Sequence, residues 1–421
     1  MYVKRLEIKN IKCFNSLSLN FSSTGDVTNL GLMLGDNGLG KTTILRSIAM
    51  SLCGTTSLLD EIEGQWLRTG ERRGEIRLET EPSDSSEKAF SVTTSFERSS
   101  LKAETKIKQT FEPNEDEIPW EKFFVCGYGA GRGIIGAETY SRYSVTDSVY
   151  TLFRYDEVLQ NSELIIRRIK DHIATDKYKR LLHWIDKILM LPVGSTKLEI
   201  GGLTVSGPWG RSVPVGALAD GHQATLAWIV DMLGWALLQN KDVFQGEISG
   251  IVLLDEVEQH LHPKWQRNII PLLRNVFPRV QFIITTHSPL VAANTGKTSL
   301  DGPKVQLFYL GQEDTAVKLS EVEENLEDLN ATQVLSSEAF GHIFTTNPTI
   351  EKVLREASVL AAKDNRTEEE ERKYKQIKDM LKETMFPKGM TLIERIVEKE
   401  YYSDLEKKVE DFNKILNKGT E

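Results

Sequence analysis

The sequence predicts an α/β fold with a mixed central sheet and flanking helices, and three observations carry this prediction. The apolar stretch NLGLML runs into the glycine-rich loop GDNGLGKTT, and TTILRSIAMSL follows with helical periodicity. The short apolar runs GIVLLDE and VQFIITTH suit strands that are buried on both faces. Helical patterns separate and follow these runs, as expected for a parallel sheet covered by helices.

Length and composition indicate an ordinary globular protein. The 421 residues suffice for roughly two or three domains, and 40% are hydrophobic while 27% are charged. No apolar stretch reaches the ~18 residues of a membrane span, and MYVKRLEIKN lacks the apolar core of a secretory signal. We therefore expect a cytoplasmic protein with no membrane partner.

The cysteine pattern and the net charge argue against two classes of protein, those held by disulfides or zinc-thiolate sites and those that coat nucleic acid. Cys13, Cys53 and Cys126 form no C-x-x-C pair, which argues against disulfides and zinc-thiolate sites and favours reduced thiols. The net charge of −9 is opposite to that of a protein whose main surface coats nucleic acid. DNA contact would need a local patch or a partner subunit.

The chain divides into a long N-terminal part and a charged tail. Residues 1–22 alternate as two strands, residues 76–112 again read as strands, and together they predict an antiparallel β subdomain. Residues 150–192 are helical, SGPWGRSVP is a loop, and ATLAWIVDMLGWALLQN is an apolar helix. We expect a helical lobe over about 132–217.

The tail from about 347 predicts three charged helices. They cover NPTIEKVLREASVLAAKD, TEEEERKYKQIKDMLKETM and TLIERIVEKEYYSDLEKKVEDFNKIL, and the capping box Thr367-x-x-Glu370 opens the second. The charge pattern fits a solvated helical face or a surface that docks a partner.

The loop at 35–43 fits the phosphate-binding pattern G-x-x-x-x-G-K-[ST] in its required strand–loop–helix context. Its glycines let backbone N–H groups approach phosphates, Lys41 reaches the β- and γ-phosphates, and the Thr42 hydroxyl ligates Mg²⁺. The cofactors expected are ATP and Mg²⁺. The predicted nucleotide-binding residues here are Gly35, Asp36, Asn37, Gly38, Leu39, Gly40, Lys41, Thr42 and Thr43.

Two acids and a histidine follow the buried runs. Asp255, at the end of Ile251–Leu254, is suited to hold the hydration shell of the metal, and Glu256 is suited to take a proton from the attacking water. His287 ends the second run, where an imidazole could reach the γ-phosphate. The alternative is a strand end with two solvated acids and a structural histidine.

VGALADGHQATLAWIVDM places a glycine-containing loop at the start of an apolar helix. This is a second anion-binding helix N-terminus in one chain, with Ala219, Asp220 and Gly221 as its candidate residues. One nucleotide cannot easily use both sites of the same subunit. A head-to-tail dimer can, with the loop of each protomer closing over the γ-phosphate of the other.

In this order, the phosphate loop, LADGHQ, LLDE and TTHS resemble the ABC-type ATPase head shared by SMC-like, RecF-like and OLD-family proteins. The resemblance covers about residues 1–310 and implies a P-loop NTPase head that dimerises around ATP. We expect the ATPase domain to span 1–345 and a C-terminal helical partner or oligomerisation region to span 346–421. LADGHQ stands in place of the family signature L-S-G-G-Q, and Ala219 lacks the hydroxyl of the signature serine. This departure leaves the hydrolysis rate open.

Other family features are absent or changed. Fewer than 100 residues separate GYGAGRG from LADGHQ, which excludes long coiled-coil arms. The family's Q-loop glutamine is not evident, and Tyr128 or Arg132 are candidates to replace it. EQHLHPKWQ has two histidines at i and i+2, which face apart, so we interpret it as the loop that faces the dimer partner and not as a metal site.

The C-terminal stretch LNATQVLSSEAFGHIFTTNPTIEKVL is similar to ATPase subunits of the PtuA type, from Septu and retron-associated anti-phage systems. This resemblance implies a defence ATPase that regulates a separately encoded HNH nuclease of the PtuB type. Two alternatives are a RecF-like repair ATPase that binds DNA directly and an ATPase sensor paired with another toxin, as in PARIS-like systems. The sequence leaves open the phage trigger, the oligomer size, the effector and whether ATP binding or hydrolysis activates it.

Overall fold

A computed structural model describes most of the chain: residues 1–23, 26–54, 66–83, 87–98, 105–120, 123–132, 135–239, 248–295, 305–313, 316–340, 356, 360 and 367–384. The chain forms two compact units, Met1–Ile343 and Phe344–Glu421. The sequence places this boundary after residue 345.

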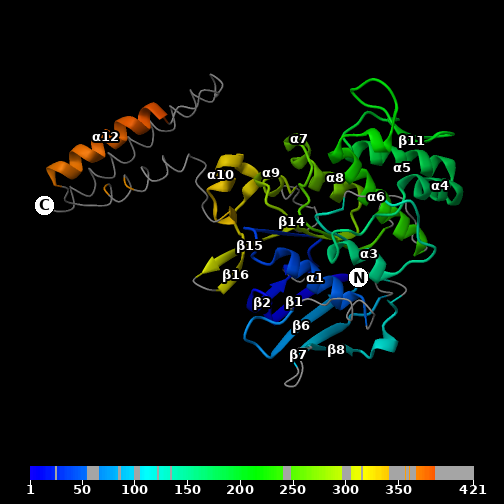
Figure 1. Ribbon diagram of the computed structural model, residues 1–421, viewed down its shortest axis with the longest axis horizontal. Helices are drawn as coiled ribbons and strands as arrows, with labels where there is room; N and C mark the ends of the chain where they lie inside the picture. The colour runs from blue at the N-terminus through cyan, green and yellow to red at the C-terminus, as the bar shows by residue number, and fades with distance from the viewer. Residues whose placement is uncertain are drawn as a thin grey trace. The chain divides into compact units, whose positions relative to one another are not determined.

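A six-stranded mixed sheet forms the centre of the first unit (Figure 1). Its order is β16-β15-β5-β14-β13-β9, and every neighbouring pair is parallel except β15 and β16. The bounds are β5 Leu30–Gly35, β9 Val125–Tyr128, β13 Gly250–Leu254, β14 Val280–Thr285, β15 Val305–Glu313 and β16 Ala316–Glu321. The α/β fold predicted from the sequence is confirmed.

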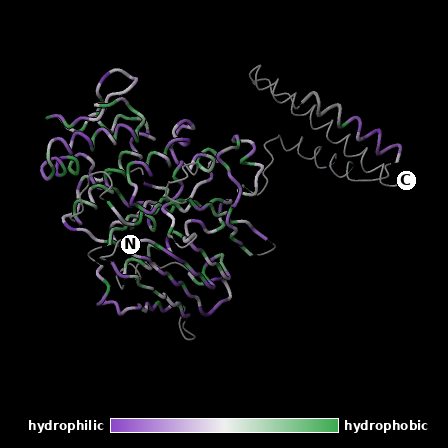
Figure 2. The backbone as a smooth tube through the Cα atoms, turned by 180° about the vertical axis from the view of Figure 1, so that it is seen from behind, coloured by the Kyte–Doolittle hydropathy of each residue, from purple (hydrophilic) through white to green (hydrophobic). Residues whose placement is uncertain are grey.

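The central strands are buried on both faces because alternate residues enter two separate cores. In β13, Val252 and Leu254 pack in one core while Ile251 and Leu253 pack in the other. Successive side chains of a strand point to opposite faces, so an uninterrupted apolar run satisfies both. Figure 2 shows green, hydrophobic stretches of the backbone running through the interior of this unit.

The second sheet is antiparallel and has the order β2-β1-β6-β7-β8. Its strands are β1 Tyr2–Ile11, β2 Phe14–Asn20, β6 Arg73–Glu81, β7 Ser91–Arg98 and β8 Thr105–Glu112, and a small pair, β3 Ser22–Ser23 and β4 Asp26–Val27, follows β2. Helix α1 (Lys41–Leu52) contacts strands of both sheets and is almost wholly buried. The predicted N-terminal antiparallel subdomain is confirmed.

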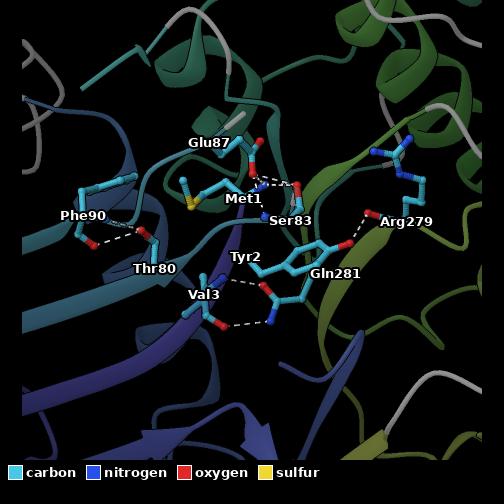
Figure 3. A network of polar contacts seen from close by, with 9 residues as sticks. All are labelled: Met1, Tyr2, Val3, Thr80, Ser83, Glu87, Phe90, Arg279 and Gln281. Carbon is cyan, nitrogen blue, oxygen red and sulfur yellow. Dashed lines mark hydrogen bonds and ion pairs between the residues drawn. The ribbon is translucent and has the colours of Figure 1, made fainter. Parts of the chain in front are cut away.

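The first strand is tied to the central sheet by polar contacts (Figure 3). The Gln281 side chain in β14 accepts a hydrogen bond from Val3 N (2.7 Å) and donates one to Val3 O (2.9 Å). The Tyr2 hydroxyl donates to Arg279 O at 3.0 Å, and the Met1 amine contacts Ser83 and Glu87. The bonds to Gln281 and Arg279 hold the antiparallel sheet against β14, the strand that leads to His287.

The lobe predicted over 132–217 is only partly helical. It contains α3 Val145–Val149, α4 Ser162–His172 and α5 Thr175–Ile188, followed by a three-stranded sheet of β10 Thr196–Glu199, β11 Gly202–Val205 and β12 Val213–Pro214. The prediction that SGPWGRSVP is wholly a loop is wrong, since β12 lies at its end; strands of two to four residues are too short to show an alternating pattern. The long helix α6 (Asp220–Leu238) then packs against α4 and β9.

Among its described residues, the first unit also contains four short helices: α7 Pro263–Gln266, α8 Ile269–Val276, α9 Pro289–Ala292 and α10 Ala331–Leu335. Single-turn 3-10 helices cover Glu115–Glu117, Tyr150–Leu152, Val215–Ala217, Leu326–Asp328 and Glu338–Phe340. No helix in the described ranges is long and apolar enough to cross a membrane.

In the second unit, the structure describes helix α12 (Glu368–Thr384), whose beginning is hydrophilic (Figure 2). Its predicted capping box is present: Thr367 N donates to Glu370 Oε2 at 3.0 Å, and Glu370 N donates to Thr367 Oγ1 at 3.3 Å. The predicted helices at 347–364 and 391–416 lie outside the described residues, apart from 356 and 360.

Candidate functional site

The phosphate loop connects β5 to α1, as the sequence predicts. Gly38 and Gly40 have φ angles of 82° and 91°, which side chains rarely adopt. A Cβ at Gly40 would also lie 2.5 Å from the Cys13 sulfur and 2.5 Å from the Phe14 ring, so the β1–β2 turn packs directly on the loop. Glycine is required here for conformation and for space.

Lys41 is buried at the start of α1 and folds back over the loop. Its ammonium group donates to Gly35 O at 2.7 Å and to Asp36 O at 2.9 Å. Burial lowers the pKa of Lys41, and the nearby Asp255 and Glu256 carboxylates oppose this shift. The Lys41 ammonium group is thus held beside the loop by two neutral carbonyl oxygens. An anionic ligand would be a stronger acceptor and could replace them.

Asp255, directly after β13, joins two neighbouring elements. Its Oδ2 accepts a hydrogen bond from Thr42 Oγ1 in α1 at 2.7 Å, and its Oδ1 accepts one from Thr285 Oγ1 at the end of β14 at 2.6 Å. Parallel strands bring these carboxyl ends to one edge of the sheet. A hydroxyl and a carboxylate, both hard oxygen ligands, therefore meet beside the phosphate loop.

Glu256 adopts a conformation that is unusual for a residue with a side chain. Its φ is 47°, and its backbone N–H donates to Thr285 Oγ1 at 2.7 Å. The residue is half-buried, so its carboxylate is available to the pocket. Strained backbone conformations of this kind cluster at active sites and ligand-binding segments, and Glu256 is the residue with this conformation that lines the pocket.

Glu258 organises the segment that carries His287. Its carboxylate accepts a hydrogen bond from Thr286 Oγ1 at 2.7 Å and another from the His287 backbone N–H. His287 itself is half-buried. The acid of EQHLHP thus orients the histidine segment.

These elements enclose a pocket of about 190 Å³. Its lining residues are Asn37, Gly38, Gly40, Lys41, Thr42, Thr43, Asp255, Glu256 and His287. The structure thereby brings the predicted phosphate loop, acids and histidine together. Gly35, Asp36 and Leu39 belong to the same loop without lining the pocket.

Ala219, Asp220 and Gly221 do not line this pocket. Ala219 is the exposed N-cap of α6, with no side-chain capping bond, and Asp220 is also exposed. Gly221 is buried against the loop after β13, where an added Cβ would lie 2.3 Å from His260 O. The N-terminus of α6 is available on the surface instead of facing the phosphate loop of its own chain.

The two Q-loop candidates have other partners. The Tyr128 hydroxyl donates to Asp231 Oδ2 in α6 at 2.9 Å, and burial raises the Tyr128 pKa well above its usual value. Tyr128 is therefore part of the contact between β9 and α6 and does not line the pocket. Arg132 binds backbone carbonyl groups next to the site.

EQHLHPKWQ has a structural explanation without a metal. His260 is exposed with a φ of 63°, and His262 Nδ1 accepts from Lys264 N at 3.2 Å as the N-cap of α7. Within the described residues, no cluster of three or more histidine, cysteine or acidic side chains could hold a metal ion.

Thr285 was not identified from the sequence, although it holds both acids. Thr285→Val is expected to reduce the free energy of unfolding by about 1–3 kcal/mol, because the Glu256 N–H and one Asp255 oxygen lose a buried partner. Urea denaturation measures this change. Thr204→Val, whose hydroxyl makes a long exposed contact, serves as the control and should change stability by less than about 0.5 kcal/mol. Equal effects of both substitutions would contradict this assignment.

Comparison with known proteins agrees with this architecture. The chain is 24% identical over 431 residues to the Septu protein PtuA of Bacillus mycoides (strain KBAB4), covering 99% of this chain and 56% of that protein. It is 26% identical over 404 residues to the retron Ec83 "probable ATPase" of Escherichia coli, covering 75% of this chain and 73% of that protein. The chain thus spans little more than half the length of the Bacillus relative.

Among solved structures, an SMC head bound to the C-winged helix domain of ScpA matches with a TM-score of 0.50 and 14% identity, covering 78% of this chain and all of that chain. At this identity the match shows the fold alone. Residues 32–293, which contain every element of the site, match the family described as "AAA domain, putative AbiEii toxin, Type IV TA system". The chain therefore belongs to this AAA domain family, and it is related to the Septu PtuA and retron ATPase proteins.

Proposed function

We propose that the chain binds ATP with Mg²⁺ in the 190 Å³ pocket and hydrolyses it. The observation that carries this proposal is the convergence of Lys41, Thr42, Asp255, Glu256 and His287 on one pocket at the carboxyl ends of the strands. Backbone N–H groups of the loop and the N-terminus of α1 suit the phosphates. Membership of an ATPase domain family agrees with this assignment.

The hydrogen-bonded oxygens of Thr42 and Asp255 fit Mg²⁺, which binds to few protein oxygens and keeps several waters. Thr42 would ligate the ion directly and Asp255 through water. When bound, Mg²⁺ neutralises charge on the β- and γ-phosphates.

Glu256 acts as the general base in this proposal. A water oxygen forms a bond to the γ-phosphorus, the bond from the γ-phosphorus to the β–γ bridging oxygen breaks, and the water proton passes to the Glu256 carboxylate. The products are ADP and inorganic phosphate. Lys41 and His287 hold the γ-phosphate oxygens during this step.

The N-terminus of α6 completes the site in a second protomer. It carries the positive end of a 19-residue helix and is exposed at Ala219 and Asp220, yet it lies outside the pocket of its own chain. A head-to-tail dimer would place these residues, with Gly221, against the γ-phosphate bound to the partner. ATP then links the two protomers, and the dimer forms only with nucleotide bound.

Ala219→Glu tests this dimer. A carboxylate at a helix N-terminus is favourable in the free chain but repels a phosphate of the partner. We expect unchanged ATP affinity and melting temperature, with loss of the ATP-dependent increase in mass measured by light scattering. Ala331→Glu adds the same charge at the start of α10, outside the site, and should dimerise normally. ATP-dependent dimerisation of Ala219→Glu would refute the arrangement.

We further propose that dimer closure regulates a separately encoded HNH nuclease in anti-phage defence. The relatives named Septu PtuA and retron ATPase support this role, and the region 346–421, predicted from the sequence to be helical, is the proposed docking region. Co-expression with the product of the gene adjacent to this chain's gene, followed by affinity purification with and without ATP, tests it; an HNH nuclease that co-purifies supports the proposal. Failure to co-purify in either state, together with strongly salt-dependent binding of duplex DNA by the chain alone, would favour a repair ATPase.

A further inference from the structure

Arg132 is a buried cation that the mechanism above does not use. It lies in the loop after β9, and its side chain is only 4% exposed. Its Nη1 donates to Gly129 O at 3.0 Å and to Asp255 O at 2.5 Å, while its Nη2 donates to Glu256 O at 2.9 Å. Its guanidinium group thus binds backbone carbonyl groups, two of which belong to the pocket acids.

Burying the Arg132 guanidinium costs desolvation free energy, which only specific interactions of the charged group can offset. Burial lowers the pKa of Arg132 to about 10, which leaves the group protonated at neutral pH, and the nearby carboxylates of Asp255, Glu258 and Glu256 partly offset the shift. An apolar side chain often fills a buried position at lower cost when only packing is needed. The charge therefore calls for an explanation beyond packing.

The backbone of Glu256 is held from two sides. On one side, Thr285 in β14 accepts its N–H; on the other, Arg132 donates to its carbonyl oxygen. β13 lies between β14 and β9 in the sheet, so the two contacts come from opposite neighbours. Together they secure a residue whose φ of 47° is unfavourable for a side-chain-bearing residue.

We propose that Arg132 is a positioning residue for hydrolysis: its forked guanidinium fixes the Asp255–Glu256 backbone so that the Glu256 carboxylate faces the attacking water. This inference rests on the proposed role of Glu256 as the base. Arg132 does not touch the nucleotide in this account and acts through Glu256 alone. A lysine could reach one carbonyl group but cannot reproduce the planar fork.

The test compares full-length wild type, Arg132→Met and Arg132→Lys for ATP turnover and for affinity toward a fluorescent ATP analogue. We expect kcat to fall about 100-fold in Arg132→Met, because the base is misplaced, while affinity changes less than about threefold. Arg132→Lys should recover part of this loss, to within about tenfold of wild type. Arg168→Met removes a half-buried arginine that binds Tyr140 O and Thr139 Oγ1 in the lobe, and it should keep wild-type turnover.

A double-mutant cycle separates positioning from general structural support. In single-turnover reactions, Arg132→Met added to Glu256→Gln should cause no further loss of rate, because both substitutions disable the same group. Thermal melting shows whether each variant is folded. If Arg132→Met does not fold, the turnover of Arg132→Lys tests the positioning role instead.

Three results would overturn the inference: wild-type turnover in a folded Arg132 variant, a loss of affinity that accounts for the loss of turnover, or additive losses in the cycle. Absence of turnover in the wild type would instead refute the proposed hydrolysis. The two failures are therefore distinguishable.

Discussion

Lys41→Ala is expected to weaken ATP binding by at least about 100-fold. The ammonium group of Lys41 is buried beside the phosphate loop and rests on two carbonyl oxygens, Gly35 O and Asp36 O, which a phosphate would replace as its partners. Charge-assisted hydrogen bonds contribute roughly 1.5–3 kcal/mol each, and alanine removes all of those that Lys41 makes. Equilibrium titration with a fluorescent ATP analogue measures the loss.

The control for this substitution is Lys197→Ala, which removes an exposed lysine from β10 in the lobe. It should keep wild-type affinity. Because Lys41 is buried, the melting temperature of both variants must be compared with that of wild type. A folded Lys41→Ala variant that binds ATP normally would refute the assignment of the phosphate loop.

Glu256→Gln is expected to bind ATP normally and to hydrolyse it about 100- to 10,000-fold more slowly. The amide is nearly the same size as the carboxylate and leaves the backbone bonds to Thr285 and Arg132 in place, but it cannot accept the proton of water. Phosphate release measured with a coupled assay gives the rate. In the proposed dimer the γ-phosphate contacts the partner's α6, and hydrolysis removes that phosphate, so this slow variant should also accumulate as the ATP-bound dimer.

The exposed acid Glu323 provides the control, and Glu323→Gln should keep full turnover. Full turnover in Glu256→Gln would show that another group accepts the proton. The remaining acid of the pocket, Asp255, is engaged with Thr42 and Thr285 and is less available for that role.

Most of the site could be predicted because its chemistry lies in short local patterns. The glycines of GDNGLGKTT allow the backbone conformation that the loop needs, so the loop is recognisable from its own sequence. The runs before Asp255 and His287 are apolar enough to be predicted as buried strands. Parallel pairing then brings the ends of β5, β13 and β14 to one edge of the sheet. The meeting of Thr42 with Asp255 follows from this topology.

Long-range and backbone contacts could not be predicted. The sequence offers Arg132 only as a Q-loop candidate, because its carbonyl partners Asp255 O and Glu256 O lie more than 120 positions along the chain and any residue type supplies a carbonyl group. Thr285 looks like an ordinary β-branched strand residue until its hydroxyl is seen between Asp255 and Glu256. The small sheet of the lobe was missed because its strands are too short for a period-2 pattern.

The central claim of this account is that each active site is shared between two protomers, and mixing two inactive variants tests it most directly. Lys41→Ala cannot hold ATP but keeps an intact α6 N-terminus, whereas Ala219→Glu binds ATP but cannot complete its partner's site. Each variant alone should show almost no ATP turnover. A mixed dimer contains one complete site, so turnover should reappear on mixing and depend on the ratio of the two chains. If the mixture shows no ATP turnover, or if Ala219→Glu alone hydrolyses ATP at the wild-type rate, the shared site is contradicted.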